Sequence, residues 1–233
     1  MKSLFTTLIL LFYSFLTFGQ QMLLEEWNKE SITNKRLIPK YGYQEKSENE
    51  KNADIDFIKT ALAKDTSNRD ASNRLIQLGF AYVYKDLKTA MYRFNQAYLL
   101  DSTNTDIYWG FGGVYMTLGD FENAKKQYLI GLSIDSNNTH LLTDYGTYFM
   151  IQYFELEKTS KNDALTNLDS AISNLMKSYS INPLDENTTY KLSVCFWYKK
   201  DCKNALKYHD ECKLLGGKPI NANYTKDLLE KCN

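Results

Sequence analysis

Apolar and small residues recur along the middle of the chain with the spacing of helices that bury one face. In four stretches a small residue is followed three positions later by an aromatic one, and these pairs are Gly79 and Tyr82, Gly112 and Tyr115, Gly146 and Phe149, and Ser193 and Phe196. Around each pair, apolar positions follow at i, i+3, i+4 and i+7, which is the period of an amphipathic helix. The pattern predicts one helix over each stretch.

A second set of positions repeats downstream of these stretches. An alanine is followed four residues later by a bulkier side chain, in the pairs Ala90 and Phe94, Ala124 and Tyr128, Ala171 and Leu175, and Ala205 and His209. Successive alanines lie 34, 47 and 34 residues apart. Each unit is expected to hold two antiparallel helices whose small residues let the backbones approach closely. Because one such pair buries only one face by itself, neighbouring pairs must stack to complete a core.

The second unit carries a pattern that is specific to a known family. Its sequence YWGFGGVYMTLGDFENAKKQYLIGLSIDSNN resembles the tetratricopeptide repeat (TPR), although the family's closing proline survives only as Pro183. The resemblance implies an all-α fold, an α-solenoid of about four helix-turn-helix repeats with N-terminal and C-terminal capping helices. The expected repeats are 70–104, 105–138, 139–185 and 186–219.

The third repeat is longer than the others, since its interval equals 34 residues plus an insertion of 13. Apolar residues such as Tyr153 and Leu165 favour a helical hairpin over a disordered loop, with a polar turn near 159–162. Outside the repeats, 20–69 is expected to form an N-terminal segment with capping helices: a short helix over 20–31, a loop over 39–50 and a helix over 52–64. Residues 220–233 are expected to form a closing helix whose Leu228 and Leu229 cover the last repeat.

The first residues read as a secretory signal, which we place at 1–19. Lys2 precedes an apolar run from Leu4 to Phe18, and its length of about 15 residues falls short of the roughly 20 that span a bilayer. Thr17 and Gly19 suit a cleavage site. The alternative is a buried core helix or an uncleaved anchor. The pattern favours an exported chain, periplasmic or secreted, that is soluble after signal removal.

Charge and composition argue against several classes of function. The 233 residues include 28 basic and 28 acidic side chains. This balance disfavours nucleic-acid binding, which needs surplus Lys and Arg on one face. The hydrophobic content of 43% is enough for a buried core. With only 2 His, the chain has little material for His-based catalysis or a His-rich metal site. No cofactor and no metal are predicted.

A curved array of helix pairs lines its concave side with first helices, so the positions that face this groove can be counted from each small residue. The predicted partner-binding groove consists of Asn73, Ile76, Phe80, Asp106, Trp109, Met116, His140, Thr143, Thr147, Met150, Asn187, Tyr190 and Trp197. Aromatic residues are enriched at binding surfaces, so Trp109 and Trp197 are expected to anchor an extended or helical peptide. The alternative is that the curve is tight and these residues pack on each other or under the N-terminal segment.

Four cysteines near the C-terminus suggest disulfides in an exported chain, and they are Cys195, Cys202, Cys212 and Cys232. Cys202 and Cys212 are ten residues apart on one predicted helix, about 15 Å, which is too far to bond. Two pairings remain: Cys195–Cys202 with Cys212–Cys232, or Cys195–Cys212 with Cys202–Cys232. The first is favoured because Cys195 and Cys202 flank one tight turn. The alternative is that some of the four are small buried residues.

No arrangement of residues indicates catalysis. His209 shares a predicted helix face with two cysteines, yet it takes the place that large side chains take in other repeats, which favours packing over metal binding. A hydrolase would need an acid pair in the insertion, where the acidic residues are Glu155, Glu157 and Asp163. These fit a solvated helix face better.

The sequence therefore favours a non-enzymatic scaffold of the cell envelope or exterior that binds a protein or peptide in its concave groove. The alternative is an accessory carbohydrate- or peptide-binding module that uses the aromatic groove. A sugar site would leave the faces of aromatic rings exposed. A peptide site would add asparagine or charged groups that hold a backbone.

Overall fold

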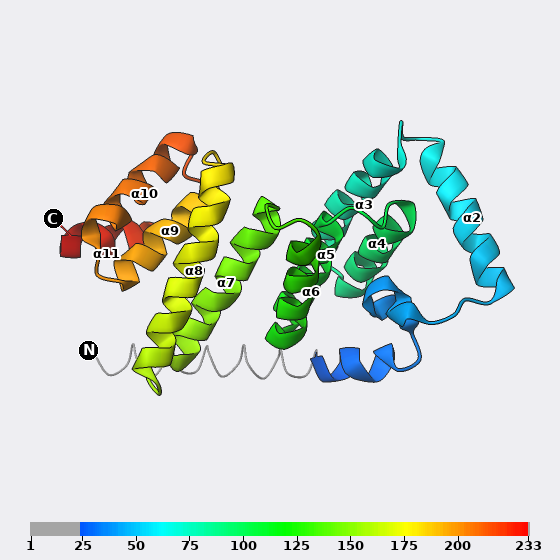
Figure 1. The fold of residues 1–233 in the computed structure, drawn as a ribbon, viewed down its shortest axis with the longest axis horizontal. Coiled ribbons are helices and arrows are strands. Elements are labelled where there is room, and N and C mark those ends of the chain that lie inside the picture. Colours follow the sequence, from blue (N-terminus) through cyan, green and yellow to red (C-terminus); the bar gives the residue numbers. More distant parts are fainter. Residues whose placement is uncertain (1–23, 233) are drawn as a thin grey trace. The chain divides into compact units, whose positions relative to one another are not determined.

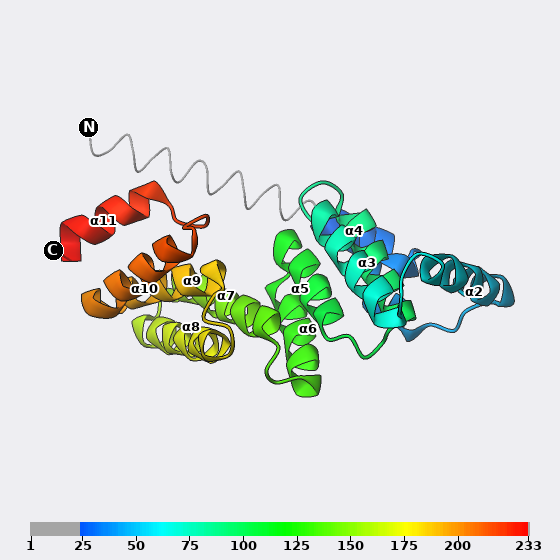
Figure 2. The same ribbon diagram turned by 90° about the horizontal axis from the view of Figure 1, so that it is seen from above.

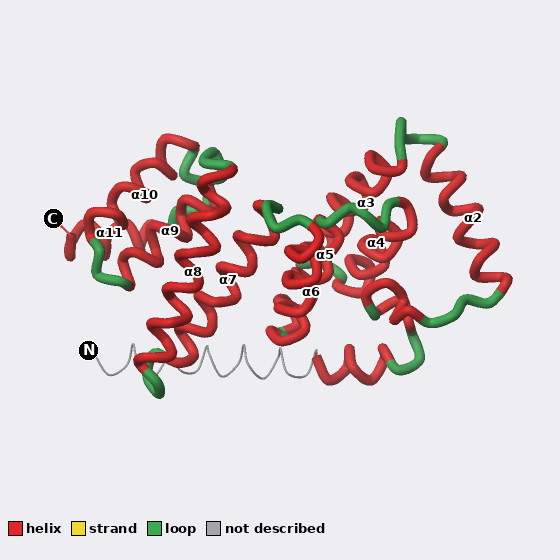
Figure 3. Tube along the Cα trace, viewed as in Figure 1, coloured by secondary structure: helices red, strands yellow, loops and turns green. Residues whose placement is uncertain are grey.

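The computed structural model describes residues 24–232, and all regular structure in that part of the chain is helical (Figures 1 and 3). The prediction of an all-α fold built from packed helix pairs is confirmed. The chain divides into two compact units, Met1–Gln127 and Tyr128–Asn233. The expected signal at 1–19 lies outside the described residues. No helix within 24–232 is both long enough and apolar enough to cross a bilayer.

In the first unit, residues 24–31 form a helix, followed by two short 3-10 helices, η1 (Lys35–Leu37) and η2 (Pro39–Tyr43). The longer helices are α2 (Glu48–Leu62), α3 (Asn68–Tyr82), α4 (Leu87–Leu100) and α5 (Asp106–Leu118), and α6 (Phe121–Ile134) crosses the boundary between the units. Helices α3 and α4 form the first pair, α5 packs against both, and η1 and η2 lie on α4. Helix α2 contacts α3 and α4.

Short polar residues set where these helices begin. The Ser47 side chain accepts a hydrogen bond from the backbone of Glu50, whose carboxylate accepts one from the backbone of Ser47. This reciprocal capping box starts α2 at Glu48. The prediction that the helix begins at 52 was therefore wrong, and so was the prediction that the loop extends to 50. The Asp86 side chain caps α4 by accepting hydrogen bonds from the backbone of Lys88 and Thr89. Helix α5 is followed by Gly119 as its C-cap, and the φ of 76° at this position suits glycine.

Phe94 is the centre of packing in the first unit. Its ring is fully buried and lies where a side chain at Gly79 or Gly110 would be, because a Cβ at those positions would fall 2.5 Å and 2.3 Å from it. Small residues on the two helices were predicted to let the backbones approach, and at Gly79 the space that a side chain would need is occupied by the large ring of Phe94. Helix α5 packs against the same ring at Gly110, and this contact joins the first helix pair to the next helix.

The second unit contains α7 (Thr139–Leu156), α8 (Lys161–Ile181), α9 (Glu186–Tyr198), α10 (Cys202–Leu215) and α11 (Ala222–Cys232). Helix α7 pairs with α8 and α9 with α10, while α8 packs on α9 and α11 on α10. The helical hairpin predicted for the insertion is confirmed, since α7 and α8 have 18 and 21 residues against 13 and 14 in α9 and α10.

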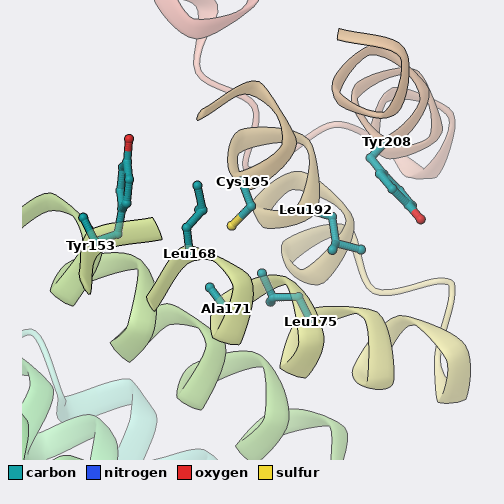
Figure 4. Packing of buried hydrophobic residues seen from close by; sticks show 8 residues of the cluster. Tyr153, Leu168, Ala171, Leu175, Leu192, Cys195 and Tyr208 are labelled. Atoms are coloured by element: carbon teal, nitrogen blue, oxygen red, sulfur yellow. The ribbon is translucent and has the colours of Figure 1, made fainter. Parts of the chain in front are cut away.

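The core of the second unit repeats the same packing rule. Figure 4 shows Leu168, Ala171 and Leu175 of α8 lying beneath Leu192 and Cys195 of α9. A Cβ at Gly146 would fall 2.8 Å from Leu175, so this glycine lets α7 approach α8.

In the last pair, the hydroxyl of Ser193 donates to the carbonyl of Ala205 at 2.7 Å. A serine therefore takes the place of glycine because its small polar side chain finds a partner in the facing backbone.

Candidate partner-binding surface

Two aromatic rings on neighbouring first helices form the clearest candidate site. Phe80 of α3 and Trp109 of α5 have ring centroids 3.9 Å apart and planes tilted by 39°, and both side chains are half-buried. Gly113 lies one helical turn beyond Trp109, where a Cβ would meet only Phe80, at 3.5 Å. We call Phe80, Trp109 and Gly113 the Phe80–Trp109 surface. The glycine leaves room for an incoming side chain beside two rings.

The glycines of α3 and α5 give a test of this geometry. We expect Gly113→Ala to raise the free energy of unfolding by about 0.5–1 kcal/mol, because alanine favours the helix and meets no obstruction. Gly79→Ala should lower it by about 1–3 kcal/mol, since its Cβ overlaps the buried ring of Phe94. Urea denaturation of the two variants measures the difference. Equal effects of the two substitutions would contradict the packing described here.

Other predicted groove residues of the first unit have different environments. Met116 and Asp106 are half-buried, and Asn73 is exposed and accepts a hydrogen bond from Asn104 at 2.8 Å. Ile76 is buried in the core, with 4% of its surface exposed. The prediction that Ile76 faces a partner was wrong, because its side chain points into the packing between helices.

In the second unit, Thr143 is buried within a cluster of hydroxyl groups. Its Oγ1 lies 2.9 Å from the hydroxyl of Ser178 and 2.6 Å from that of Thr188, which joins α7, α8 and α9. The prediction that Thr143 faces the groove was therefore wrong.

The remaining groove candidates on α7 and at the start of α9 do not form a cluster of rings. Thr147 donates to a carbonyl of its own helix, and Met150 packs partly against the core. His140 and Asn187 are exposed.

Helix α11 covers the two aromatic candidates of the last repeat. The ring of Tyr224 lies 5.6 Å from Tyr190 and 5.8 Å from Trp197, edge to face in both cases. Tyr190 and Trp197 thus pack against the C-terminal helix, which is neither the predicted open groove nor the predicted alternative. Leu228 of α11 is fully buried as predicted, whereas Leu229 is 42% exposed, so its predicted covering role was wrong.

A residue that the sequence analysis missed holds a backbone segment on α4. Asn95 is fully buried; its Nδ2 donates to the carbonyls of Arg36 at 2.9 Å and Ile38 at 3.0 Å, and its Oδ1 accepts from the backbone of Lys40 at 2.7 Å. We call residues 34–46 the N-terminal arm. The only sequence signal was a polar residue within the apolar row of α4.

Cations of the N-terminal arm lie over tyrosine rings. Arg36 is 3.9 Å from the ring centroid of Tyr92, and Lys40 is 4.5 Å from that of Tyr108. Burial lowers the pKa of Lys40, but its hydrogen bonds with Tyr108 and Tyr43 outweigh burial and raise the pKa above its ordinary value. These contacts favour a charged lysine between rings and fix the arm on the helices beneath it.

The cysteines do not pair as favoured. Cys202 and Cys232 form a disulfide with Cα atoms 5.3 Å apart, and Cys195 and Cys212 are buried free thiols. The favoured pairing was wrong, and of the alternative pairing the structure contains only the Cys202–Cys232 bond. Burial raises the pKa of the Cys195 thiol to about 12, which keeps it protonated and unreactive.

The residues considered for chemistry have packing or surface roles. His209 is buried, and its Nε2 lies 2.9 Å from the hydroxyl of Thr225, in agreement with the predicted packing role. The acidic residues of the insertion are exposed, namely Glu155, Glu157 and Asp163. Within 24–232, no group of three or more His, Cys, Asp or Glu side chains is placed to hold a metal ion.

Comparison with known proteins identifies the fold. No family profile and no curated protein sequence matches the chain. Among solved structures, a thermophilic TPR protein from Thermus thermophilus is similar with a TM-score of 0.55 and 12% identity, over 63% of this chain and 75% of that one. MamA is similar with a TM-score of 0.46 and 17% identity, over 76% of this chain and 98% of that one. The first likeness shows that the chain has the fold of TPR proteins.

Proposed function

We propose that the chain is a non-enzymatic scaffold that binds a protein or peptide through the Phe80–Trp109 surface. The observation that carries this proposal is the close, tilted contact of Phe80 and Trp109 beside the open position at Gly113. Large aromatic side chains supply much of the energy at protein interfaces, above all where they form a pocket for one partner side chain. Rings held on two packed helices lose little entropy on binding, which favours affinity.

The alternative of sugar binding has less support at this surface. Stacking on a sugar ring needs an aromatic face that lies open. At 3.9 Å the two rings cover part of each other, and both are half-buried. A partner side chain that enters over Gly113 fits this arrangement better.

The scaffold is proposed to act outside the cytoplasm. Two features support export: the charged start and short apolar run at 1–19, and the Cys202–Cys232 disulfide, a bond that persists in oxidising compartments. N-terminal sequencing of the protein from its native source is expected to begin at Gln20. Material that begins at Met1 would contradict export by a cleaved signal.

We expect the binding of a captured partner to depend on the Phe80–Trp109 surface. The wild-type chain is used to capture proteins from the envelope fraction, and each candidate is purified and titrated. Trp109→Ala removes one ring, and Gly113→Gln fills the open position. Each is expected to weaken binding at least tenfold, about 1.4 kcal/mol.

The matched control is Tyr84→Ala, since Tyr84 is an aromatic residue of the same unit that is 91% exposed at a turn. It should bind as the wild type does. Circular dichroism and thermal unfolding establish that Gly113→Gln keeps its fold. A folded Gly113→Gln variant that binds every captured partner with unchanged affinity would overturn the proposal.

A further inference from the structure

Helix α11 makes specific polar and aromatic contacts with the last helix pair. The hydroxyl of Tyr224 lies 2.7 Å from that of Ser193, and Thr225 lies 2.9 Å from Nε2 of His209. The Lys231 ammonium lies 4.9 Å from the ring centroid of Trp197. Figure 2 shows α11 lying along this pair on the side away from α8. The surface beneath α11 is therefore shaped for an amphipathic helix.

Apart from the disulfide, α11 buries little of its own surface. Leu228 is the one buried residue within α11, and seven of its eleven residues are exposed. An isolated helix of 11 residues is marginal in water, and α11 has only one buried residue to hold it on the last helix pair. We therefore expect little free energy to be needed to detach α11 once the disulfide is gone. The disulfide joins Cys202, at the start of α10, to Cys232, at the end of α11. The disulfide therefore holds the C-terminal end of α11, whereas the N-terminal end is held by the chain connection to α10.

We propose that the Cys202–Cys232 disulfide is a redox latch: its reduction releases α11 and uncovers the Tyr190–Trp197 surface, which then binds an amphipathic helix of the same chemistry as α11. That chemistry is a tyrosine and a leucine four residues apart, as in Tyr224 and Leu228. The binding of such a helix rests on the proposed function of the chain as a binding scaffold. It takes place at a surface separate from Phe80 and Trp109.

The chemistry requires a dithiol reductant. One thiolate of the dithiol attacks a sulfur of the disulfide, the S–S bond breaks, and the other cysteine leaves as a thiolate that takes up a proton. The second thiol of the reductant then attacks the mixed disulfide and releases the remaining cysteine, which also takes up a proton. The protein thereby gains two electrons and two protons, and the reductant becomes a disulfide. Cys202 and Cys232 are both partly exposed and within reach of such a reagent. Cys195 and Cys212 are buried, which keeps them out of the exchange.

Amide hydrogen exchange on the full chain tests the latch. With dithiothreitol, we expect exchange over 222–232 to accelerate at least tenfold, while the amides of α7 and α8 keep their protection. The double variant Cys202→Ser/Cys232→Ser should exchange like the reduced wild type, with or without reductant. Unchanged protection of α11 after reduction would overturn the latch, and so would loss of protection throughout the second unit, which would make the disulfide a general structural bond.

A peptide titration tests the docking surface. The probe is a labelled peptide of residues 220–233 that carries Cys232→Ser, and the receptor is the full chain with Tyr224→Ala, which weakens its own α11. The peptide should bind the reduced receptor at least tenfold more tightly than the oxidised one, and a peptide with Tyr224→Ala should lose this binding. Equal binding to both receptors would overturn the docking surface. The Phe80–Trp109 variants report on the proposed function separately.

Discussion

Phe94→Ala is expected to lower the free energy of unfolding by about 3–5 kcal/mol, the largest effect of a single truncation in the first unit. The ring is fully buried and fills the space left by two glycines, Gly79 of α3 and Gly110 of α5. It also lies edge to face with Phe80, with centroids 5.2 Å apart. Its removal leaves a cavity that the rigid helix pairs cannot close. Urea denaturation followed by circular dichroism measures the loss.

The control for this prediction is Tyr84→Ala, which removes an aromatic ring of the same unit that is 91% exposed. Its effect should stay within about 0.5 kcal/mol. Because Phe94 also supports Phe80, Phe94→Ala should weaken partner binding along with stability. A Phe94→Ala variant with the stability of Tyr84→Ala would show that the small-to-large fit does not organise this unit.

Asn95→Ala is expected to lower the free energy of unfolding by about 2–4 kcal/mol, because it removes three hydrogen bonds to the backbone of the N-terminal arm. The arm needs this support. Lys40, Tyr41 and Tyr43 have φ values of 56°, 57° and 55°, a left-handed turn that costs about 1–2 kcal/mol for each residue that is not glycine. Without Asn95, we expect the turn to relax and the arm to leave α4.

Hydrogen exchange distinguishes this local effect from general unfolding. In Asn95→Ala, amides of the N-terminal arm should exchange at least tenfold faster, while those of α3 keep their protection. Gln77→Ala on the exposed face of α3 is the control and should change neither quantity. Undisturbed protection of the arm in Asn95→Ala would contradict the clamp.

The helix pairs were predictable because their packing rule is local in sequence. Gly79 and Gly146 each stand three residues before an aromatic residue, and Phe94 and Leu175 each stand four residues after an alanine, and this periodicity identifies both helices of a pair. The start of α2 was also readable, since Ser47 and Glu50 have capping-box spacing. The prediction passed over this signal because the surrounding charges suggested a loop.

Contacts between distant segments were not predictable. Asn95 binds backbone groups more than 50 residues earlier in the chain, and nothing in its neighbourhood specifies that segment. The disulfide pairing could not be predicted without the position of α11. Once Tyr224 lies over Tyr190 and Trp197, Cys232 reaches Cys202. The groove prediction failed at Tyr190 and Trp197 for the same reason, because the repeat pattern gives the face of a helix but not what covers it.

Photo-crosslinking tests the central claim, that a partner binds at the Phe80–Trp109 surface, most directly. Benzoylphenylalanine is placed at Met116, which is half-buried on the stripe of α5 that also holds Trp109 and Gly113, and in a second protein at the exposed turn residue Tyr84. The account predicts that the partner captured by the wild type is crosslinked from position 116 and not from 84. Crosslinking of that partner from 84 but not from 116 would contradict it.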